Sequence, residues 1–221
     1  MQIAVYLIPL RRQPGNDYEQ GTLVMCPKVT SQYKTEIREK IVGAAIIAFS
    51  VHGYDRTRMD DIAETAKLSK GTLYLYFKNK EELFYAISEN NIRELKEQLS
   101  VLFTKSEDLI SDSQKFYVNF RKASGPSDKV FLETIAESSR NRKLQDMLHR
   151  QRMKVLDVIT DYLRLQIRKG FFRSDVDVNA IAAGLVALYD GLTIGKTIGI
   201  SETYNKKAWN ETIKAVLSSL R

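Results

Sequence analysis

The 221-residue chain carries 34 Lys and Arg against 27 Asp and Glu, which gives a net charge of +7. Its content of 43% hydrophobic and 28% charged residues is ordinary for a soluble folded protein. It argues against a disordered chain, which would hold fewer apolar residues, and against a membrane protein, which would hold many more. The basic excess permits a polyanionic partner and is densest early, since residues 28–80 hold ten Lys and Arg against six acids.

The cysteine count and the absence of a targeting segment favour a reducing cytoplasm. Cys26 is the single cysteine, so an intramolecular disulfide is excluded, and no histidines lie at metal-site spacing from it. No uninterrupted apolar run reaches the roughly 18–20 residues that cross a bilayer. The apolar opening, residues 1–10, has its arginines after the stretch, which is the wrong order for a signal peptide. We expect no membrane partner.

Apolar residues recur at helical spacing after residue 30, and no period-two alternation indicates strands, so the chain is predicted to be all-α. A first helix near 33–52 ends at Gly53. Two short helices follow within residues 57–77, and a longer helix, capped by Asn79, reaches about residue 103.

The second half is predicted to hold five more helices, for about nine in all. The first two lie near 107–122 and 128–139, separated by a break at Ser124-Gly-Pro-Ser127. Asn141 begins a long helix that ends at Gly170. Asp177 and Asn205 are the predicted caps of the last two helices.

The two short helices, separated by three residues, have the arrangement of a helix-turn-helix, which places its second helix in the DNA major groove. Thr57-Arg-Met-Asp60 has the form of a capping box for the first helix, and Ser69 caps the second. Leu73 and Phe77 anchor the second helix in the core. The outer positions carry residue types that suit phosphates and base edges: Lys70, Gly71, Thr72, Tyr74 and Tyr76. The alternative is an ordinary helical corner whose tyrosines pack locally.

Residues 34–90 closely resemble the TetR family of bacterial and archaeal regulators. The resemblance rests on Ile41-Val-Gly-Ala-Ala-Ile-Ile-Ala-Phe49, on Asp61-Ile-Ala63, and above all on Leu68-Ser-Lys-Gly-Thr-Leu-Tyr-Leu-Tyr-Phe77 followed by Asn79-Lys-Glu-Glu-Leu83. It implies a three-helix DNA-binding domain at 31–80 and a helical effector-binding and dimerisation domain at 81–221. Residues 1–30 form an N-terminal extension, predicted to be disordered or to lie upstream of a true start at Met25, because the sequence from Met25 onward looks like a family N-terminus.

The resemblance also implies the DNA contacts. Thr57 and Arg58 lie where the first short helix meets phosphates, and Lys80 matches a frequent phosphate contact. The reading surface comprises Ser69, which caps the helix, and Lys70, Gly71, Thr72, Tyr74 and Tyr76. Lys67 stands at a turn position often held by glycine, which predicts a left-handed lysine that costs about 1 kcal/mol.

For the second domain, the family architecture implies a homodimer whose last two helices pair with those of a second copy. Small residues that permit close helix approach support this: Ala182, Ala183, Gly184, Ala187, Gly191 and Gly195. A twofold dimer requires a palindromic double-stranded operator. An apolar pocket for a small-molecule effector of unknown identity has these candidate residues: Phe103, Phe116, Tyr117, Phe120, Phe131, Tyr162 and Tyr189. Such residues are more often simply core.

The sequence also bears on two other functions. An all-α enzyme is disfavoured because His52 and His149 have no nucleophile partner or metal spacing and no phosphate-binding glycine loop occurs. We therefore expect no catalytic residues, metal or cofactor. A non-specific architectural DNA-binding protein stays open, since a basic stretch in residues 140–154 would extend a DNA surface, although a solvated helix face explains it too. The prediction is a transcriptional regulator, most simply a repressor released by a hydrophobic ligand.

Overall fold

The computed structural model describes residues 30–101 and 109–220, and every regular element within those ranges is an α-helix, which confirms the all-α prediction. The residues from 1 to 29, including Met25, and Phe103 lie outside the described residues. The helices are α1 (Ser31–His52), α2 (Met59–Thr65), α3 (Lys70–Tyr76), α4 (Lys80–Ser100), α5 (Leu109–Ser138), α6 (Arg142–Arg168), α7 (Val178–Thr197) and α8 (Glu202–Ser219).

By packing, the chain divides into two units, Met1–Ile37 and Arg38–Arg221. In the first unit, the described residues 30–37 begin α1, where the Thr30 hydroxyl accepts a hydrogen bond from the Tyr33 amide at 3.2 Å. The second unit contains the rest of α1 and all the other helices.

The helix-turn-helix is held by a small apolar core in the second unit. The Tyr54 ring lies between those of Phe49 and Phe84, with centroid distances of 5.2 and 5.9 Å, so the end of α1 packs against the start of α4. Of the residues expected to face inward from the two short helices, Met59 is half-buried and the others are buried: Ile62, Ala63, Ala66, Leu73 and Phe77. Burial of these side chains stabilises helices that are too short to persist alone.

The predicted capping box of α2 is displaced by one residue. Arg58, not Thr57, is the N-cap, and its amide donates to the Asp61 carboxylate at 2.8 Å. Thr57 is instead buried, and its hydroxyl donates to the carbonyls of Gly53 at 2.7 Å and Ala48 at 3.2 Å. Because its hydroxyl is already engaged with the end of α1, Thr57 fastens α2 to α1 and cannot cap α2.

The turn between α2 and α3 follows the sequence prediction. Lys67 has φ +52°, and among the described residues it is the one non-glycine with a positive φ. The Ser69 hydroxyl accepts from the Thr72 amide at 3.0 Å and so begins α3. The left-handed lysine lets the chain reverse direction within three residues, at the expense of backbone strain.

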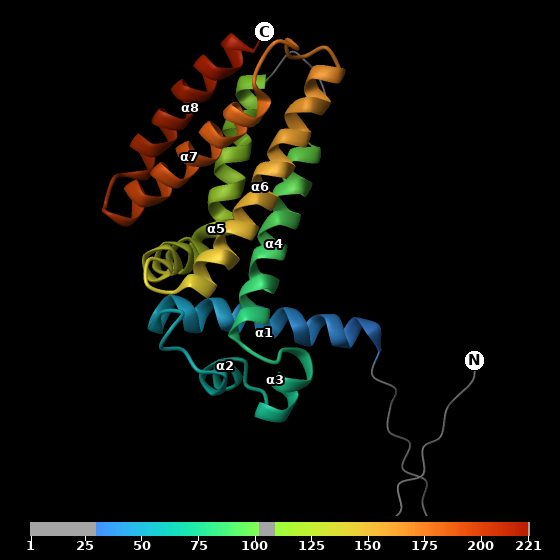
Figure 1. The fold of residues 1–221 in the computed structure, drawn as a ribbon, viewed down its shortest axis with the longest axis vertical. Coiled ribbons are helices and arrows are strands. Elements are labelled where there is room, and N and C mark those ends of the chain that lie inside the picture. Colours follow the sequence, from blue (N-terminus) through green and yellow to red (C-terminus); the bar gives the residue numbers. More distant parts are fainter. Residues whose placement is uncertain (1–29, 102–108, 221) are drawn as a thin grey trace, which may run out of the picture. The chain divides into compact units, whose positions relative to one another are not determined.

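Helices α4 and α6 run alongside each other (Figure 1). Their predicted starts are confirmed, since the Asn79 side chain accepts from the Glu82 amide at 2.9 Å and the Asn141 side chain from the Leu144 amide at 3.1 Å. Gly170, with φ +76°, follows the end of α6 as predicted. These caps satisfy amides that would otherwise lack partners at the helix starts.

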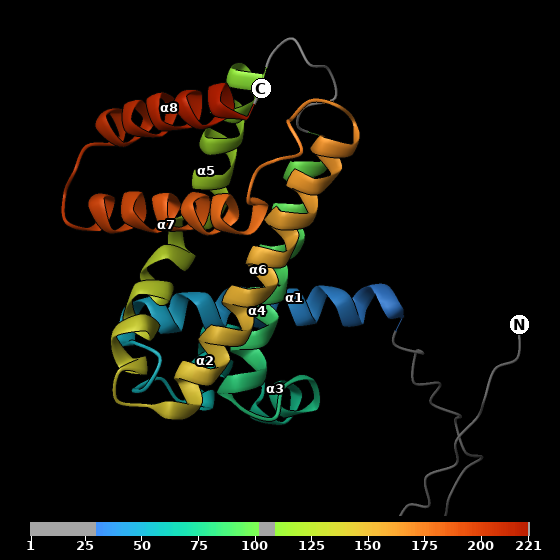
Figure 2. The same cartoon turned by 45° about the horizontal axis from the view of Figure 1, so that its top comes forward.

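The predicted break at 124–127 is wrong as a helix end, because α5 continues through it. Figure 2 shows that α5 changes direction partway along its length instead. A proline inside a helix removes one amide donor and favours a kink, and Pro126 lies within α5. The ion pair from Arg121 to Asp128 at 3.0 Å spans this region, and both residues are buried. Arg121 also donates to Thr193 of α7 at 3.0 Å, and Asp128 lies 3.9 Å from Lys196 of α7, so contacts with another helix hold both sides of this region.

Helices α7 and α8 pack side by side (Figure 2). The Asp177 cap of α7 is confirmed, since its carboxylate accepts from the amides of Asn179 and Ala180, both at 3.0 Å. The predicted cap of α8 is wrong, because Ser201 begins that helix. Asn205 is 2% exposed and donates to the Leu192 carbonyl at 3.2 Å, so it joins α8 to α7 instead.

Helix α7 is long and apolar enough to cross a membrane by length and composition, contrary to the expectation that no segment is. That expectation considered uninterrupted runs, whereas α7 carries Asp190 and Lys196 among many small and aliphatic residues. Core helices of soluble proteins pass the same test, so the property is weak evidence for a membrane.

The strained turn predicts the effect of one substitution. Lys67→Gly should raise the free energy of unfolding by about 0.5–1 kcal/mol, because glycine removes the left-handed strain at some cost in unfolded-state entropy. Urea denaturation measures this. Lys67→Ala is the control, since alanine removes the charge but keeps the strain. Equal stability of the two variants would contradict the assignment.

Candidate functional site

The first candidate site is the outer surface of α3. Ser69, Lys70, Gly71, Tyr74 and Leu75 are exposed, whereas Thr72 and Tyr76 are half-buried. Gly71 and Leu75 are four residues apart and so share one face of the helix. The predicted reading residues therefore lie together on one short helix, with hydroxyl, phenol and ammonium groups at its surface.

Lys70 is held loosely in the free protein. Its ammonium lies 2.5 Å from the Asp60 carboxylate of α2, and the two side chains keep 67% and 47% of their exposure. The hydrogen bond to Asp60 raises the pKa of Lys70, which stays protonated. Such an exposed pair contributes little to stability, so it can open when a phosphate competes for the lysine.

Leu75 is the residue on this surface that sequence reasoning missed. It is 84% exposed, more than any other large apolar residue on the described part of the chain. The signal was present, because position 75 falls between the inward positions 73 and 77. An exposed leucine side chain contributes no burial free energy to the free protein. Its apolar character suits contact with a thymine methyl group.

The structure places two other predicted DNA residues in different settings. Arg58 is exposed at the start of α2. The Lys80 ammonium donates to the carbonyls of Tyr54 and Asp55, both at 2.7 Å, and lies 4.9 Å from the centre of the Tyr54 ring. Burial lowers the pKa of Lys80. Lys80 thus ties the start of α4 to the loop after α1, and a contact with phosphate stays a prediction.

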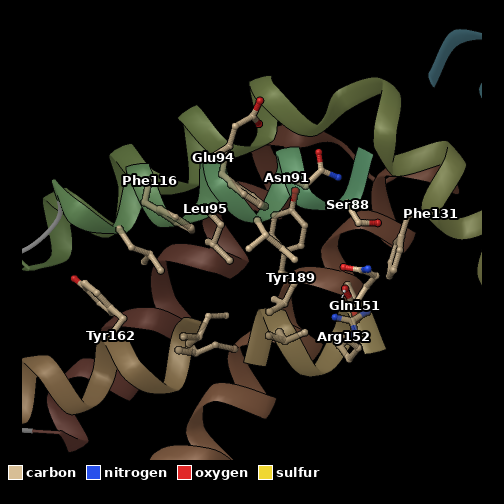
Figure 3. A pocket seen from close by; sticks show the side chains of 18 of the residues that line it. Ser88, Asn91, Glu94, Leu95, Phe116, Phe131, Gln151, Arg152, Tyr162 and Tyr189 are labelled. Carbon is tan, nitrogen blue, oxygen red and sulfur yellow. Dashed lines mark hydrogen bonds and ion pairs between the residues drawn. The ribbon is translucent and has the colours of Figure 1, made fainter. Parts of the chain in front are cut away.

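The second candidate site is a cavity of about 540 Å³ within the helices that follow α3. Helices α4, α5, α6, α7 and α8 all contribute lining residues, most of them apolar (Figure 3). Its volume falls within the roughly 300–1,000 Å³ of pockets for small ligands.

Most predicted pocket residues line this cavity. The lining includes Phe116, Phe120, Phe131, Tyr162 and Tyr189. Tyr117 does not, because it is 1% exposed and its ring packs 5.3 Å from that of Trp209 in the core between α5 and α8. Residues 116 and 117 are neighbours on a helix and point about 100° apart, so only one of them faces the cavity.

Sequence reasoning missed the contributions of α4 and α8 and, apart from Tyr162, that of α6. Phe84 and Leu95 come from α4, Gln151 and Arg152 from α6, and Trp209 from α8. The predicted aromatic residues came mainly from α5. Gln151 lies on the same face of α6 as the apolar residues Leu148 and Val155. A polar residue on an apolar stripe was the available signal.

A row of polar contacts joins α4 to α6. The Lys143 ammonium lies 2.5 Å from the Glu81 carboxylate, Arg150 Nη2 donates to the Tyr85 hydroxyl at 2.5 Å, and Lys154 pairs with Glu89. The hydrogen bond from Lys143 lowers the pKa of Glu81. These basic residues belong to the stretch that suggested an extended DNA surface. Their partners on α4 give them a structural role in the free protein.

A second polar network joins α5 to α7. The buried Arg121 donates to Asp128 at 3.0 Å, to Thr193 at 3.0 Å and, more weakly, to the Tyr189 hydroxyl at 3.4 Å. Lys196 lies 3.9 Å from the same carboxylate of Asp128. Breaking a buried pair leaves an uncompensated charge, so this network constrains the bend of α5 and its position on α7.

The described residues hold no group of three or more His, Cys, Asp or Glu placed to bind a metal. His52 is the exposed last residue of α1, and His149 is an exposed residue of α6 that lines the cavity. The two histidines are far apart in the sequence.

A helix-turn-helix with an exposed second helix, joined by one continuous helix to a helical domain with a ligand-sized cavity, defines a DNA-binding transcriptional regulator. Family comparisons agree. Residues 41–87 match the profile of bacterial regulatory proteins of the tetR family, and residues 122–221 match the C-terminal profile of BetI-type transcriptional repressors. The chain belongs to the TetR family of transcriptional regulators, which is not a family of enzymes.

Individual relatives support this assignment. The chain is 28% identical over 165 residues to the uncharacterized HTH-type transcriptional regulator YhgD of Bacillus subtilis. The aligned region covers 70% of this chain and 81% of that protein. Among solved structures, GusR of Salmonella enterica matches with a TM-score of 0.70 at 22% identity, over 87% of this chain and 97% of that one. FadR of Bacillus subtilis, solved in complex with stearoyl-CoA, matches with a TM-score of 0.66 at 18% identity, over 83% and 99%. These two structures support the fold.

Proposed function

We propose that this protein is a homodimeric, cytoplasmic repressor that binds a palindromic operator through α3 and is released by a small, mostly apolar ligand in the cavity. Residues 31–80 serve as the DNA-binding domain and residues 81–221 as the effector-binding and dimerisation domain. The observation that carries the proposal is the position of α4. Its first residue, Lys80, is bonded to the loop before α2, and its later residues, from Phe84 to Leu99, line the cavity.

This position gives a ligand a direct mechanical route to DNA binding. A ligand that displaces α4 from α6 moves Lys80, and with it the loop that leads into α2 and α3. The row of contacts between α4 and α6, including the pair of Glu81 and Lys143, resists that motion in the ligand-free state. Ligand binding then favours a conformation whose reading helices no longer match the spacing of the operator. A relative of the same fold, FadR of Bacillus subtilis, was solved with stearoyl-CoA, an acyl ligand.

The dimer is supported by an unpartnered face of α7. Residues at helical spacing along this face are exposed and small or aliphatic: Ala180, Ala183, Gly184, Ala187, Gly191, Ile194 and Ile198. A methyl group added at Gly184 or Gly191 would meet nothing within 4 Å. Glycine within a helix lowers stability by roughly 0.5–1 kcal/mol relative to alanine. Close contact with a helix of a second copy explains why glycine occupies these two positions. Ala182 and Gly195, by contrast, are buried within the chain.

The first experiment is a fluorescence-anisotropy titration against DNA from upstream of the protein's own gene, with scrambled DNA as competitor. The proposal expects binding that resists the competitor. If neither this DNA nor any sequence selected from a random pool is preferred over scrambled DNA, the chain is a non-specific DNA binder, the alternative that the basic charge leaves open.

Lys70→Ala should weaken binding to all DNA sequences by a similar factor. Because it removes one phosphate contact, the slope of log affinity against log salt concentration should fall by about one. Lys169→Ala removes an exposed lysine just after α6 and is the matched control. The same loss in both variants would show that net charge alone is responsible.

Leu75→Ala should weaken operator binding by about 0.8 kcal/mol for each CH₂ group that loses contact with the DNA. If Leu75 touches a thymine methyl, replacing that thymine with deoxyuridine should weaken wild-type binding and leave the variant unaffected. Leu165→Ala changes an exposed leucine on α6 and should have no effect. A variant that still responds to every deoxyuridine substitution as the wild type does would refute the contact.

Ala187→Arg should convert the dimer into a folded monomer, because it places a long cation on the shared face of α7. Sedimentation velocity reports the mass, and circular dichroism reports the fold. Ala136→Arg, at an exposed alanine of α5, is the control and should remain dimeric. A dimeric Ala187→Arg protein would place the interface elsewhere.

A further inference from the structure

The cavity has a polar end and an apolar end. In Figure 3, Ser88, Gln151 and Arg152 gather at one end beside Phe131. Leu95, Phe116 and Tyr162 lie toward the other end, and Tyr189 lies between them. Trp209 also belongs to the apolar lining. A ligand that fills this space therefore has a long apolar body and one small polar group.

Three of the charged side chains that line the cavity, Arg152, Asp190 and Asp128, are neutralised by partners within the chain. Arg152 pairs with Asp190 through two contacts, at 2.8 and 3.3 Å. Asp128 pairs with Arg121 at 3.0 Å. Burial raises the pKa of Asp190 even though Arg152 opposes the shift, which indicates that this part of the wall tolerates a negative charge poorly.

The remaining ionisable groups of the lining do not offer a buried counter-ion either. His149 is exposed at the edge of the cavity. Glu94 is half-buried, and in Figure 3 its carboxylate points away from Tyr189 and Gln151. A ligand with a full charge would have to displace one member of an existing pair or remain uncompensated, and both are costly in an apolar cavity.

Gln151 differs from these paired groups. It is 6% exposed, and neither its side-chain oxygen nor its side-chain nitrogen has a hydrogen-bond partner among the described residues. A buried amide without partners costs the desolvation free energy of both groups, and a polar group that supplies the missing bonds recovers it. Because the amide holds an acceptor next to a donor, its ideal partner has a donor next to an acceptor.

We propose, on the basis of the function proposed above, that the effector is an uncharged amphiphile whose head is an amide or a similar neutral donor and acceptor pair. The head pairs with both side-chain atoms of Gln151, and the apolar body extends past Tyr189 toward Phe116 and Trp209. A carboxylate offers Gln151 only acceptors and leaves its oxygen unpaired. An ammonium offers only donors and leaves its nitrogen unpaired.

Three probes with the same tail and different heads test the class: decanamide, decanoate and decylammonium. Their affinities are measured without DNA, by isothermal titration calorimetry and by fluorescence at concentrations below micelle formation. The chain has a single tryptophan, Trp209, and it lines the cavity, so its emission reports occupancy. Decanamide is expected to bind tightest. Tighter binding of either charged probe, or no binding of decanamide, would overturn the proposal.

Gln151→Leu locates the head. Loss of the two amide contacts should weaken decanamide binding by about five-fold or more, while decanoate and decylammonium change less. Gln166→Leu is the matched control, because Gln166 is also a buried glutamine of α6, with 1% exposure and an unpaired oxygen, but does not line the cavity. Equal losses for all three probes, or the same loss in the control, would overturn the role of Gln151.

The assay separates this proposal from the proposed function. Binding of the probes is measured without DNA, so a charged preference would refute the ligand class and leave the repressor standing. Decanamide that binds in the cavity but does not release the operator would refute the ligand-controlled repressor and leave the chemistry of the cavity standing.

Discussion

The packing of α4 is the constraint on which the rest of this structure depends. Asn79 caps the first turn of α4, and the Lys80 ammonium donates to backbone carbonyls before α2. The following turns of α4 line the cavity. A helix transmits displacement along its axis because each turn is hydrogen-bonded to the next. The helix-turn-helix and the cavity are therefore not independent modules joined by a linker. In the mechanism proposed above, a change in one reaches the other through this single helix.

The polar contacts explain how such an element holds its position and still moves. The pair of Glu81 and Lys143 and the contact of Tyr85 with Arg150 lie on the surface, where each is worth about 1 kcal/mol or less. The contacts of Arg121 are buried, and losing one of its partners costs much more. This difference between weak surface contacts and strong buried contacts suits a regulator. The contact of α4 with α6 can rearrange while the arrangement of α5 on α7 stays fixed.

Sequence reasoning succeeded where one local interaction decides the outcome. The caps by Ser69, Asn79, Asn141 and Asp177, and the left-handed Lys67, each depend on a few adjacent residues, and all are present in the structure. It failed where two local interpretations compete and distant contacts choose between them.

Three failures show that competition. Thr57 and Asn205 both have side chains that cap helices, yet each is drawn into the core to bond a carbonyl of another segment. Gly125-Pro126 disfavours a continuous helix, yet α5 continues through it, and Arg121 and Asp128 on either side are held against α7. In each case, burial of a whole helix outweighs the preference of one residue.

The same distinction separates the two candidate sites. The sequence by itself determined the all-α fold, the helix-turn-helix and its exposed surface, because their periodicity and motifs lie within about twenty consecutive residues. Only the tertiary structure decided the cavity, because its lining comes from five helices between Phe84 and Leu220. It also decided that Gln151 faces inward without a partner while Arg152 is paired, since both depend on which side chains of α5 and α7 lie opposite α6. Local order is encoded by neighbours in sequence, whereas the chemistry of a cavity is set by residues that only folding brings together.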